Sequence, residues 1–254
     1  MALRTNNPIL RDKVFQNLPA TAEPMTLNGT IARAGLLLVL MLITGAWTWH
    51  RFMLGAASGN LAAGITAIQP FFWGGLIVGF VLALASAFKP TWSPVTAPLY
   101  ALAEGTFLGA ISAIFEVRYH GIVLQAVMAS VGVLLVMLVV YRSGIIKVTQ
   151  KFRIGVIAAT GGIALLYLVQ WGIVAFTHGN GMSFISGGGS LAIGFSILVV
   201  CLAALNLALD FDLIERATNS GAPKYMEWYC AFGLMVTLVW LYLELLRLLG
   251  NSRR

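Results

Sequence analysis

Long apolar stretches separated by short polar breaks dominate this chain. A helix that crosses the hydrocarbon core of a bilayer needs about 20 mainly apolar residues. Seven stretches reach that length, at 31–50, 70–88, 97–117, 121–142, 153–176, 187–210 and 226–248. The pattern therefore predicts an all-α integral membrane protein with seven transmembrane helices. The segment 50–70 is also largely apolar and can lend residues to either neighbouring helix.

The ends of the chain are more polar than the stretch between them. Residues 1–30 hold three prolines and lack the apolar core of a secretory signal, so they are predicted to form a cytoplasmic N-terminal arm. Residues 31–250 are predicted to form one transmembrane domain, because their polar connections are too short for a separate globular domain. Residues 251–254 are a short C-terminal tail.

Composition supports a membrane protein and narrows its function. The 254 residues are 59% hydrophobic and 10% charged, whereas a soluble domain has roughly a quarter charged residues. The net charge of +7 comes from Lys and Arg residues in short interhelical segments, which set membrane orientation and predict no nucleic-acid partner. Cys201 and Cys230 lie in or beside apolar segments and are expected to pack as small hydrophobes. No His-Glu-x-x-His zinc pattern occurs, so we expect neither an enzyme nor a cofactor.

Basic residues are distributed unequally between the two sides of the predicted helices. Eleven fall on the side of the N-terminus: Arg4, Arg11, Lys13, Arg33, Lys89, Arg142, Lys147, Lys151, Arg153, Arg216 and Lys224. Five fall on the other side: Arg51, Arg118, Arg247, Arg253 and Arg254. Because cytoplasmic loops carry the excess of Lys and Arg, the N-terminus is predicted to be cytoplasmic and the C-terminus external.

Two pairs of glycines have the spacing of helix-packing motifs. Gly75 and Gly79 lie one turn apart in the second predicted helix, and Gly105 and Gly109 do so in the third. Such spacing allows the backbones of neighbouring membrane helices to approach closely.

The sixth predicted helix ends in two acids, Asp210 and Asp212. An ionised carboxylate is expensive in hydrocarbon, so an acid kept there usually faces a polar interior or an ion pathway. The alternative is that both acids only mark the water interface. Asp212 lies nearer to water and can pair with Arg216 one turn later, which favours a structural role for it.

Glu104 is predicted to share a membrane depth with Asp210. At 1.5 Å per residue, Glu104 lies about 10 Å and Asp210 about 9 Å from the cytoplasmic ends of their helices. No Lys or Arg lies within either apolar stretch near these acids. Two such carboxyl groups can share a proton or bind a hard cation such as Ca²⁺. We therefore hypothesise that Asp210 and Glu104 form a pH-sensitive cation site.

The last predicted helix carries two further acids. Glu227 starts this helix, where a negative charge complements the helix dipole, and it is also a candidate for the cation pathway. Glu244 lies about 25 Å further along, near the outer face of the bilayer. It either attracts cations at the outer mouth or pairs with Arg247 three residues later.

Three motifs together resemble the Bax-inhibitor-motif membrane proteins, in their bacterial branch. The motifs are Ala-Leu-Asp-Phe-Asp-Leu-Ile at 208–214, Glu-Gly-Thr-Phe-Leu-Gly at 104–109 and Leu-Tyr-Leu-Glu-Leu-Leu-Arg-Leu-Leu at 241–249. The resemblance covers most of 31–250 and implies a bundle with the seventh helix at its centre. It also implies a pH-sensitive calcium leak and a location in the bacterial inner membrane.

The resemblance carries over to some site residues and not to others. In this family an aspartate late in the sixth helix pairs with an aspartate in the seventh to form a proton-sensitive gate. Asp210 matches the first, whereas Thr237 stands where the second is expected. Glu104 or Glu227 is then the replacement partner of Asp210. Lys89 is similar to the basic residue that precedes the third helix in this family, and it is therefore a candidate gate.

Two functions remain open from the sequence. The first is a passive leak for Ca²⁺, gated by protonation of buried carboxylates, with the bilayer, protons and Ca²⁺ as partners. The second is a non-conducting membrane regulator that binds a membrane protease or a stress or survival protein, as the resemblance also implies. Acids that face an aqueous cavity would favour the leak.

The first prediction concerns orientation. Reporter tags at residue 5 and within 216–224 should be cytoplasmic, and tags within 178–186 and after Arg254 should be external, because of the unequal distribution of Lys and Arg. Accessibility of each tag to an impermeant reagent measures this. A cytoplasmic C-terminus would contradict the seven-span topology.

Overall fold

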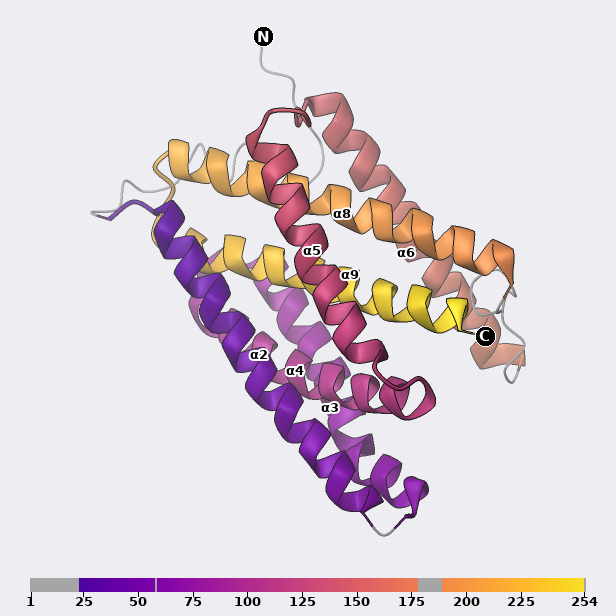
Figure 1. The fold of residues 1–254 in the computed structure, drawn as a ribbon. Helices are drawn as coiled ribbons and strands as arrows, with labels where there is room; N and C mark the ends of the chain where they lie inside the picture. The colour runs from indigo at the N-terminus through magenta and orange to yellow at the C-terminus, as the bar shows by residue number, and fades with distance from the viewer. Residues whose placement is uncertain (1–22, 58, 178–188, 254) are drawn as a thin grey trace. The chain divides into compact units, whose positions relative to one another are not determined.

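The structure, a computed structural model, describes residues 23–57, 59–177 and 189–253. These ranges contain seven helices that are long and apolar enough to cross a membrane, which confirms the predicted fold class. In chain order the elements are α2 (Leu27–Ala56), α3 (Leu61–Phe88), the 3-10 helix η1 (Pro90–Trp92), α4 (Ser93–Arg118), α5 (Ile122–Arg142), α6 (Gln150–Thr177), α8 (Ser190–Asn219) and α9 (Met226–Ser252) (Figure 1). Most of the predicted N-terminal arm lies outside the described residues.

The apolar segment 50–70 is divided between two helices. α2 continues to Ala56, and α3 begins at Leu61 rather than at residue 70. Asn60 caps α3, since its side chain accepts hydrogen bonds from the Ala62 and Ala63 amides at 3.1 and 3.3 Å. Pro70 therefore lies inside α3 and does not start it. Membrane helices tolerate such prolines because neighbouring groups satisfy the backbone groups that proline frees.

The chain divides into two compact units, and helices α8 and α9 contribute to both. The first unit contains residues up to Ile114 together with 213–235, and the second contains 115–212 together with 236–254. Helix α9 is enclosed along nearly its whole length, since only Val236 and Ser252 in it are exposed. This burial agrees with the central position that the resemblance implied for the last helix.

Glycines bring α2 and α3 against α4 in the first unit. A Cβ atom on Gly75 of α3 would lie 2.6 Å from the Ala103 carbonyl oxygen of α4. A Cβ on Gly109 of α4 would lie 2.8 Å from Cα of Gly45 in α2. Gly75 and Gly109, one from each predicted glycine pair, thus lie at backbone contacts too close for a larger residue without movement of the helices.

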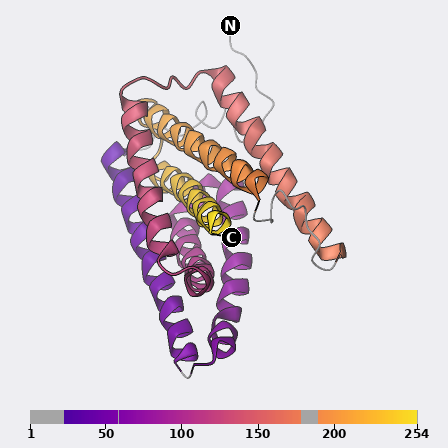
Figure 2. The same ribbon diagram turned by 45° about the vertical axis from the view of Figure 1, so that its right-hand side comes forward.

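In the second unit an apolar cluster joins α6 to α8. Val156 and Ile163 of α6 pack with Val199 and Leu202 of α8. The ribbon shows α8 running beside α9 (Figures 1 and 2). The C-terminal end of α9 is fixed within this unit, because Asn251 donates a hydrogen bond to Ser196 of α8 at 3.2 Å.

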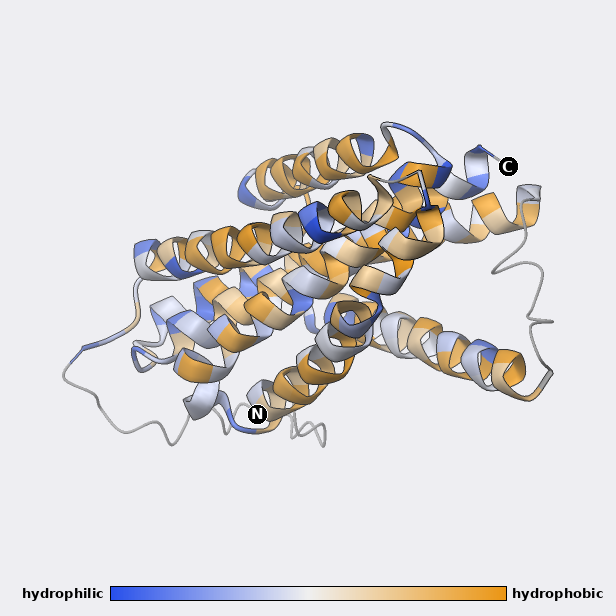
Figure 3. Cartoon of the chain, turned by 90° about the horizontal axis from the view of Figure 1, so that it is seen from below, coloured by the Kyte–Doolittle hydropathy of each residue, from blue (hydrophilic) through white to orange (hydrophobic). Residues whose placement is uncertain are grey.

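Large apolar side chains cover the outward faces of the helices. Hydrophobic residues extend along most of each helix in Figure 3. Those that are more than half exposed include Ile77 and Phe80 of α3, Val139 of α5 and Leu168 and Trp171 of α6. A soluble protein rarely exposes so much contiguous apolar surface, whereas a bilayer covers it with acyl chains. The seven helices thus fit an integral membrane protein.

The second prediction tests the contact between α2 and α4. A Cβ on Gly105 would overlap the Thr44 hydroxyl and the Met41 carbonyl oxygen, so Gly105→Ala should lower stability by about 1–3 kcal/mol, the usual cost of overpacking. Thermal unfolding in detergent measures the change. Gly35→Ala in α2 is the matched control, because no atom lies within 4 Å of its added Cβ. Equal melting temperatures for the two variants would contradict this packing.

Candidate cation site and buried carboxylates

Asp210 lies in α8 against α9. Its carboxylate accepts a hydrogen bond from the Thr237 hydroxyl of α9. Its Oδ2 atom is buried and has no hydrogen-bond partner. Thr237, noted in the sequence only as a departure from the family pattern, is therefore the residue that contacts Asp210. The carboxylate is thus held by the Thr237 hydroxyl of α9, while its Oδ2 atom has no hydrogen-bond partner.

Asp212, two residues later, has a different environment. Its Oδ2 atom forms an ion pair with Nη2 of Arg153 in α6 at 2.9 Å, and both side chains are partly exposed. The sequence suggested Arg216 of the same helix as a partner, but it could not indicate Arg153, which lies 59 residues away in the chain. The negative charge of Asp212 is thus balanced by a basic residue from a neighbouring helix.

Glu104 is buried in α4, with only 8% of its surface exposed. Gly79 of α3 makes room for its carboxylate, since a Cβ there would lie 2.7 Å from Glu104 Oε2. Within the described residues Glu104 has no ion pair. Glu104 belongs to the first unit and Asp210 to the second. Their pairing stays a prediction.

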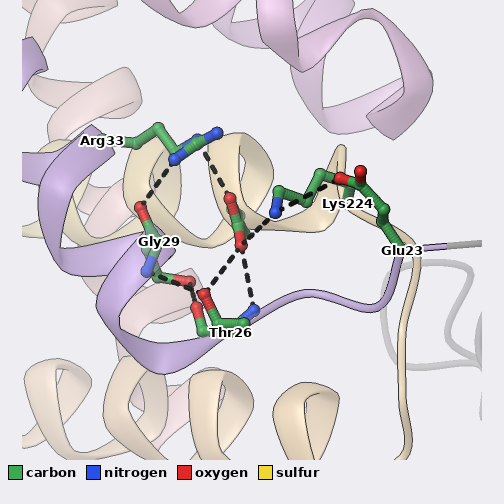
Figure 4. Close-up of polar contacts among 7 residues, drawn as sticks. Glu23, Thr26, Gly29, Arg33 and Lys224 are labelled. Carbon is green, nitrogen blue, oxygen red and sulfur yellow. Dashed lines mark hydrogen bonds and ion pairs between the residues drawn. The ribbon is translucent and has the colours of Figure 1, made fainter.

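Glu227, in the first turn of α9, is completely buried. Its donors include Thr26, Arg33 and Lys224, which are labelled in Figure 4. Its Oε1 atom accepts from the Thr26 amide at 2.9 Å and from the Thr26 hydroxyl at 3.1 Å. Its Oε2 atom lies 3.0 Å from Nε of Arg33, and Lys224 Nζ is 3.9 Å from Oε1. A Cβ on Gly29 would overlap the carboxylate, so only glycine leaves room for it.

These contacts make Glu227 the anchor of the segment that precedes α2. Thr26 is the N-cap of α2, so the Glu227 carboxylate lies at the positive end of that helix as well as of its own. The same segment is held by a bridge between Pro24 and Pro223 and by the Met25 amide, which donates to the Ala222 carbonyl at 2.7 Å. The arrangement favours the structural role that the helix-dipole argument gave Glu227.

Glu244 is also buried and also paired. Its Oε1 atom accepts from the Tyr167 hydroxyl of α6 at 2.8 Å and from the Trp240 indole at 3.3 Å. Arg247 lies 3.3 Å from its Oε2 atom, which confirms the ion pair predicted from their spacing. The Arg247 guanidinium also donates to the Tyr167 hydroxyl and stacks 4.6 Å from the centre of its ring. A role for Glu244 at the outer mouth stays a prediction.

Lys89, the candidate gate, caps the C-terminal end of α3. Its Nζ atom lies 4.2 Å from the centre of the Trp92 ring in η1. A cation over an indole face is a favourable contact. This contact places Lys89 at the turn between α3 and α4, and its role as a gate stays a prediction.

The described residues contain no cluster typical of a resident metal ion. Across 23–57, 59–177 and 189–253, no three His, Cys, Asp or Glu side chains gather in one place. A protein cage for Ca²⁺ usually supplies six to eight oxygen ligands. The predicted cation site formed by Asp210 and Glu104 stays a prediction.

The fold and the enclosed acids define the class as a seven-helix membrane protein with ionisable groups in its interior. The family model described as Bax inhibitor 1 like matches residues 7–254, and the chain belongs to this family. No curated protein and no solved structure matches the chain. The match confirms the family that the three sequence motifs indicated.

The third prediction tests the anchoring role of Glu227. Glu227→Leu should destabilise the protein by about 3–5 kcal/mol, because it leaves Arg33 without its buried partner. Hydrogen exchange at the Met25 and Thr26 amides should increase as residues 23–26 detach. Glu23→Gln is the control, because Glu23 is exposed and meets Lys224 at 3.6 Å, and exposed pairs contribute little. Unchanged exchange in Glu227→Leu would refute the anchoring role.

Proposed function

We propose that this protein is a passive, pH-sensitive leak for calcium or similar cations, with Asp210 as the central ionisable group. The observation that carries the proposal is the Asp210 carboxylate, whose Oδ2 atom is buried without a hydrogen-bond partner. A carboxylate in the interior of a membrane protein that lacks a basic partner is expensive to keep unless it binds protons or cations.

The choice of Asp210 is supported by the fact that three other interior acids have basic partners. Asp212 is paired with Arg153, Glu244 with Arg247, and Glu227 with Arg33. Within the described residues, Asp210 and Glu104 are the two interior acids without a basic partner. The sequence analysis predicted a common membrane depth for these two acids, and each leaves its negative charge without a basic partner in its own unit.

Thr237 gives the site a different chemistry from a pair of aspartates. A threonine hydroxyl can donate a hydrogen bond to an ionised carboxylate and does not carry charge itself. It therefore orients Asp210 without competing for a proton. We infer that a single carboxylate, that of Asp210, provides the charge that attracts the cation.

Protons and Ca²⁺ compete in this mechanism. Protonation of Asp210 removes the negative charge that a hard cation requires, so acidification reduces Ca²⁺ occupancy and flux. The ion passes down its gradient, and the protein supplies no energy. A regulator that only binds a partner would not require an uncompensated acid in its interior, which is why the leak is preferred.

The fourth prediction is the direct test of this function. Asp210→Asn should abolish most Ca²⁺ flux into proteoliposomes and most of its change between about pH 6 and 8, because an amide can neither ionise nor replace a charged ligand. Asp212→Asn should have a smaller effect, since the charge of Asp212 is already balanced by Arg153. Glu104→Gln tests the predicted contribution of the second acid.

Glu215→Gln provides the matched control, because Glu215 is an exposed acid of the same helix. All variants should first show wild-type helix content and melting temperature. If Asp210→Asn keeps both the flux and its pH dependence, the leak mechanism is wrong, and the regulator that binds a membrane partner becomes the better proposal.

A further inference from the structure

Helix α6 is attached to its unit by one apolar cluster and by a set of polar pairs. Up to Phe176, only Val156 and Ile163 of this helix are buried. Both belong to the apolar cluster shared with α8. In a bilayer, an apolar helix face packs against lipid almost as well as against another helix, so polar pairs and close packing decide how helices associate.

Three polar pairs follow one face of α6 at a spacing of seven residues. Arg153 pairs with Asp212 of α8 at 2.9 Å. The Asn206 amide of α8 donates to the Thr160 hydroxyl at 2.8 Å. Further along, the Tyr167 hydroxyl donates to Glu244 of α9 at 2.8 Å.

Seven residues make almost two turns, so the three side chains recur on one face about 10 Å apart along the helix. Val156 and Ile163 alternate with them at the intervening positions of the same seam. We call the set of Arg153, Val156, Thr160, Ile163 and Tyr167 the α6 seam. Its two polar pairs with α8 flank Asp210 in the sequence of α8, at Asn206 and Asp212.

We propose that Arg153 and Thr160 are positioning residues that fix α8 on both sides of Asp210 and so hold its carboxylate against Thr237. Asn206 precedes Asp210 by one helical turn, and Asp212 follows it by two residues. A helix held at both places can neither rotate nor slide freely. The side of α8 that bears Asp210 is therefore kept toward α9.

Hydrogen bonding at Asn206 strengthens the middle of the seam. Its Nδ2 atom also donates to the Leu202 carbonyl of its own helix at 2.9 Å, so both amide protons take part in hydrogen bonds. The amide is thus held in one orientation before it meets Thr160. At the other polar pair, the planar guanidinium of Arg153 offers several donors in a fixed geometry, which suits directional contact with a carboxylate.

The role of the α6 seam rests on the proposed function, since it assigns residues that orient the carboxylate of the leak. The positioning of Asp210 can also be measured without transport, by infrared spectroscopy. The stretching band of a protonated carboxyl group reports its hydrogen bonding. The band of Asp210 can be identified in infrared spectra by its loss in Asp210→Asn.

The fifth prediction combines this band with Ca²⁺ flux into proteoliposomes. Arg153→Gln and Thr160→Val should each move the Asp210 band in the direction produced by Thr237→Val. Each should also reduce flux by roughly threefold, the scale of one interhelical hydrogen bond in a membrane. Thr160→Ser should recover most of the band position and of the flux, because it restores the hydroxyl. Arg153→Lys restores the charge but not the planar guanidinium, so it should recover only part of each.

Two controls separate positioning from general effects of substitution. Lys151→Gln removes a positive charge from an exposed position in the same turn of α6, and Thr66→Val removes an exposed hydroxyl that bonds within α3. Neither should move the band or the flux. An unmoved band in both Arg153→Gln and Thr160→Val overturns the inference, even if Asp210→Asn abolishes flux. Conversely, flux and pH dependence that survive Asp210→Asn refute the proposed function, while the band still tests the positioning.

Discussion

Compensation of negative charge in a poorly hydrated interior is the constraint on which this structure depends. Separating an ionised carboxylate from water costs several kcal/mol, and an acid that is kept there needs donors or a positive partner. Glu227 and Glu244 receive both, and Asp212 receives an arginine. Arg33 reaches Glu227 and Arg153 reaches Asp212 from another helix, so compensation of these two acids also fixes how the helices pack.

Enclosing an acid between helices also requires space for its carboxylate, and glycine residues provide it. Gly29 leaves room for the Glu227 carboxylate, and Gly79 does the same for Glu104. Where helices meet without an intervening acid, Gly45 and Gly109 let the backbones themselves touch. In water these contacts would be driven by hydrophobic burial. In lipid that driving force is absent, so close packing and interhelical hydrogen bonds hold the helices together.

The environment of Asp210 differs from that of the acids with a basic partner. Asp210 has a hydroxyl donor in Thr237, but no basic residue among the described residues balances its charge. Arg153 forms its ion pair with Asp212, two residues after Asp210 in the chain. Three of the interior acids have a basic partner that helps to hold the helices together, whereas Asp210 and Glu104 have none within the described residues.

The sequence by itself determined the fold class, the seven spans and the acids worth attention, because these follow from local hydropathy and from residue types. The family followed from the resemblance of three short motifs. It also predicted the pair of Glu244 and Arg247, since both lie on one helix at a fixed spacing. Only the tertiary structure decided that Thr237 contacts Asp210, that Arg153 balances Asp212, and that Thr26 and Arg33 enclose Glu227. These partners are distant in sequence, and no local pattern encodes which faces of two membrane helices meet when both are largely apolar.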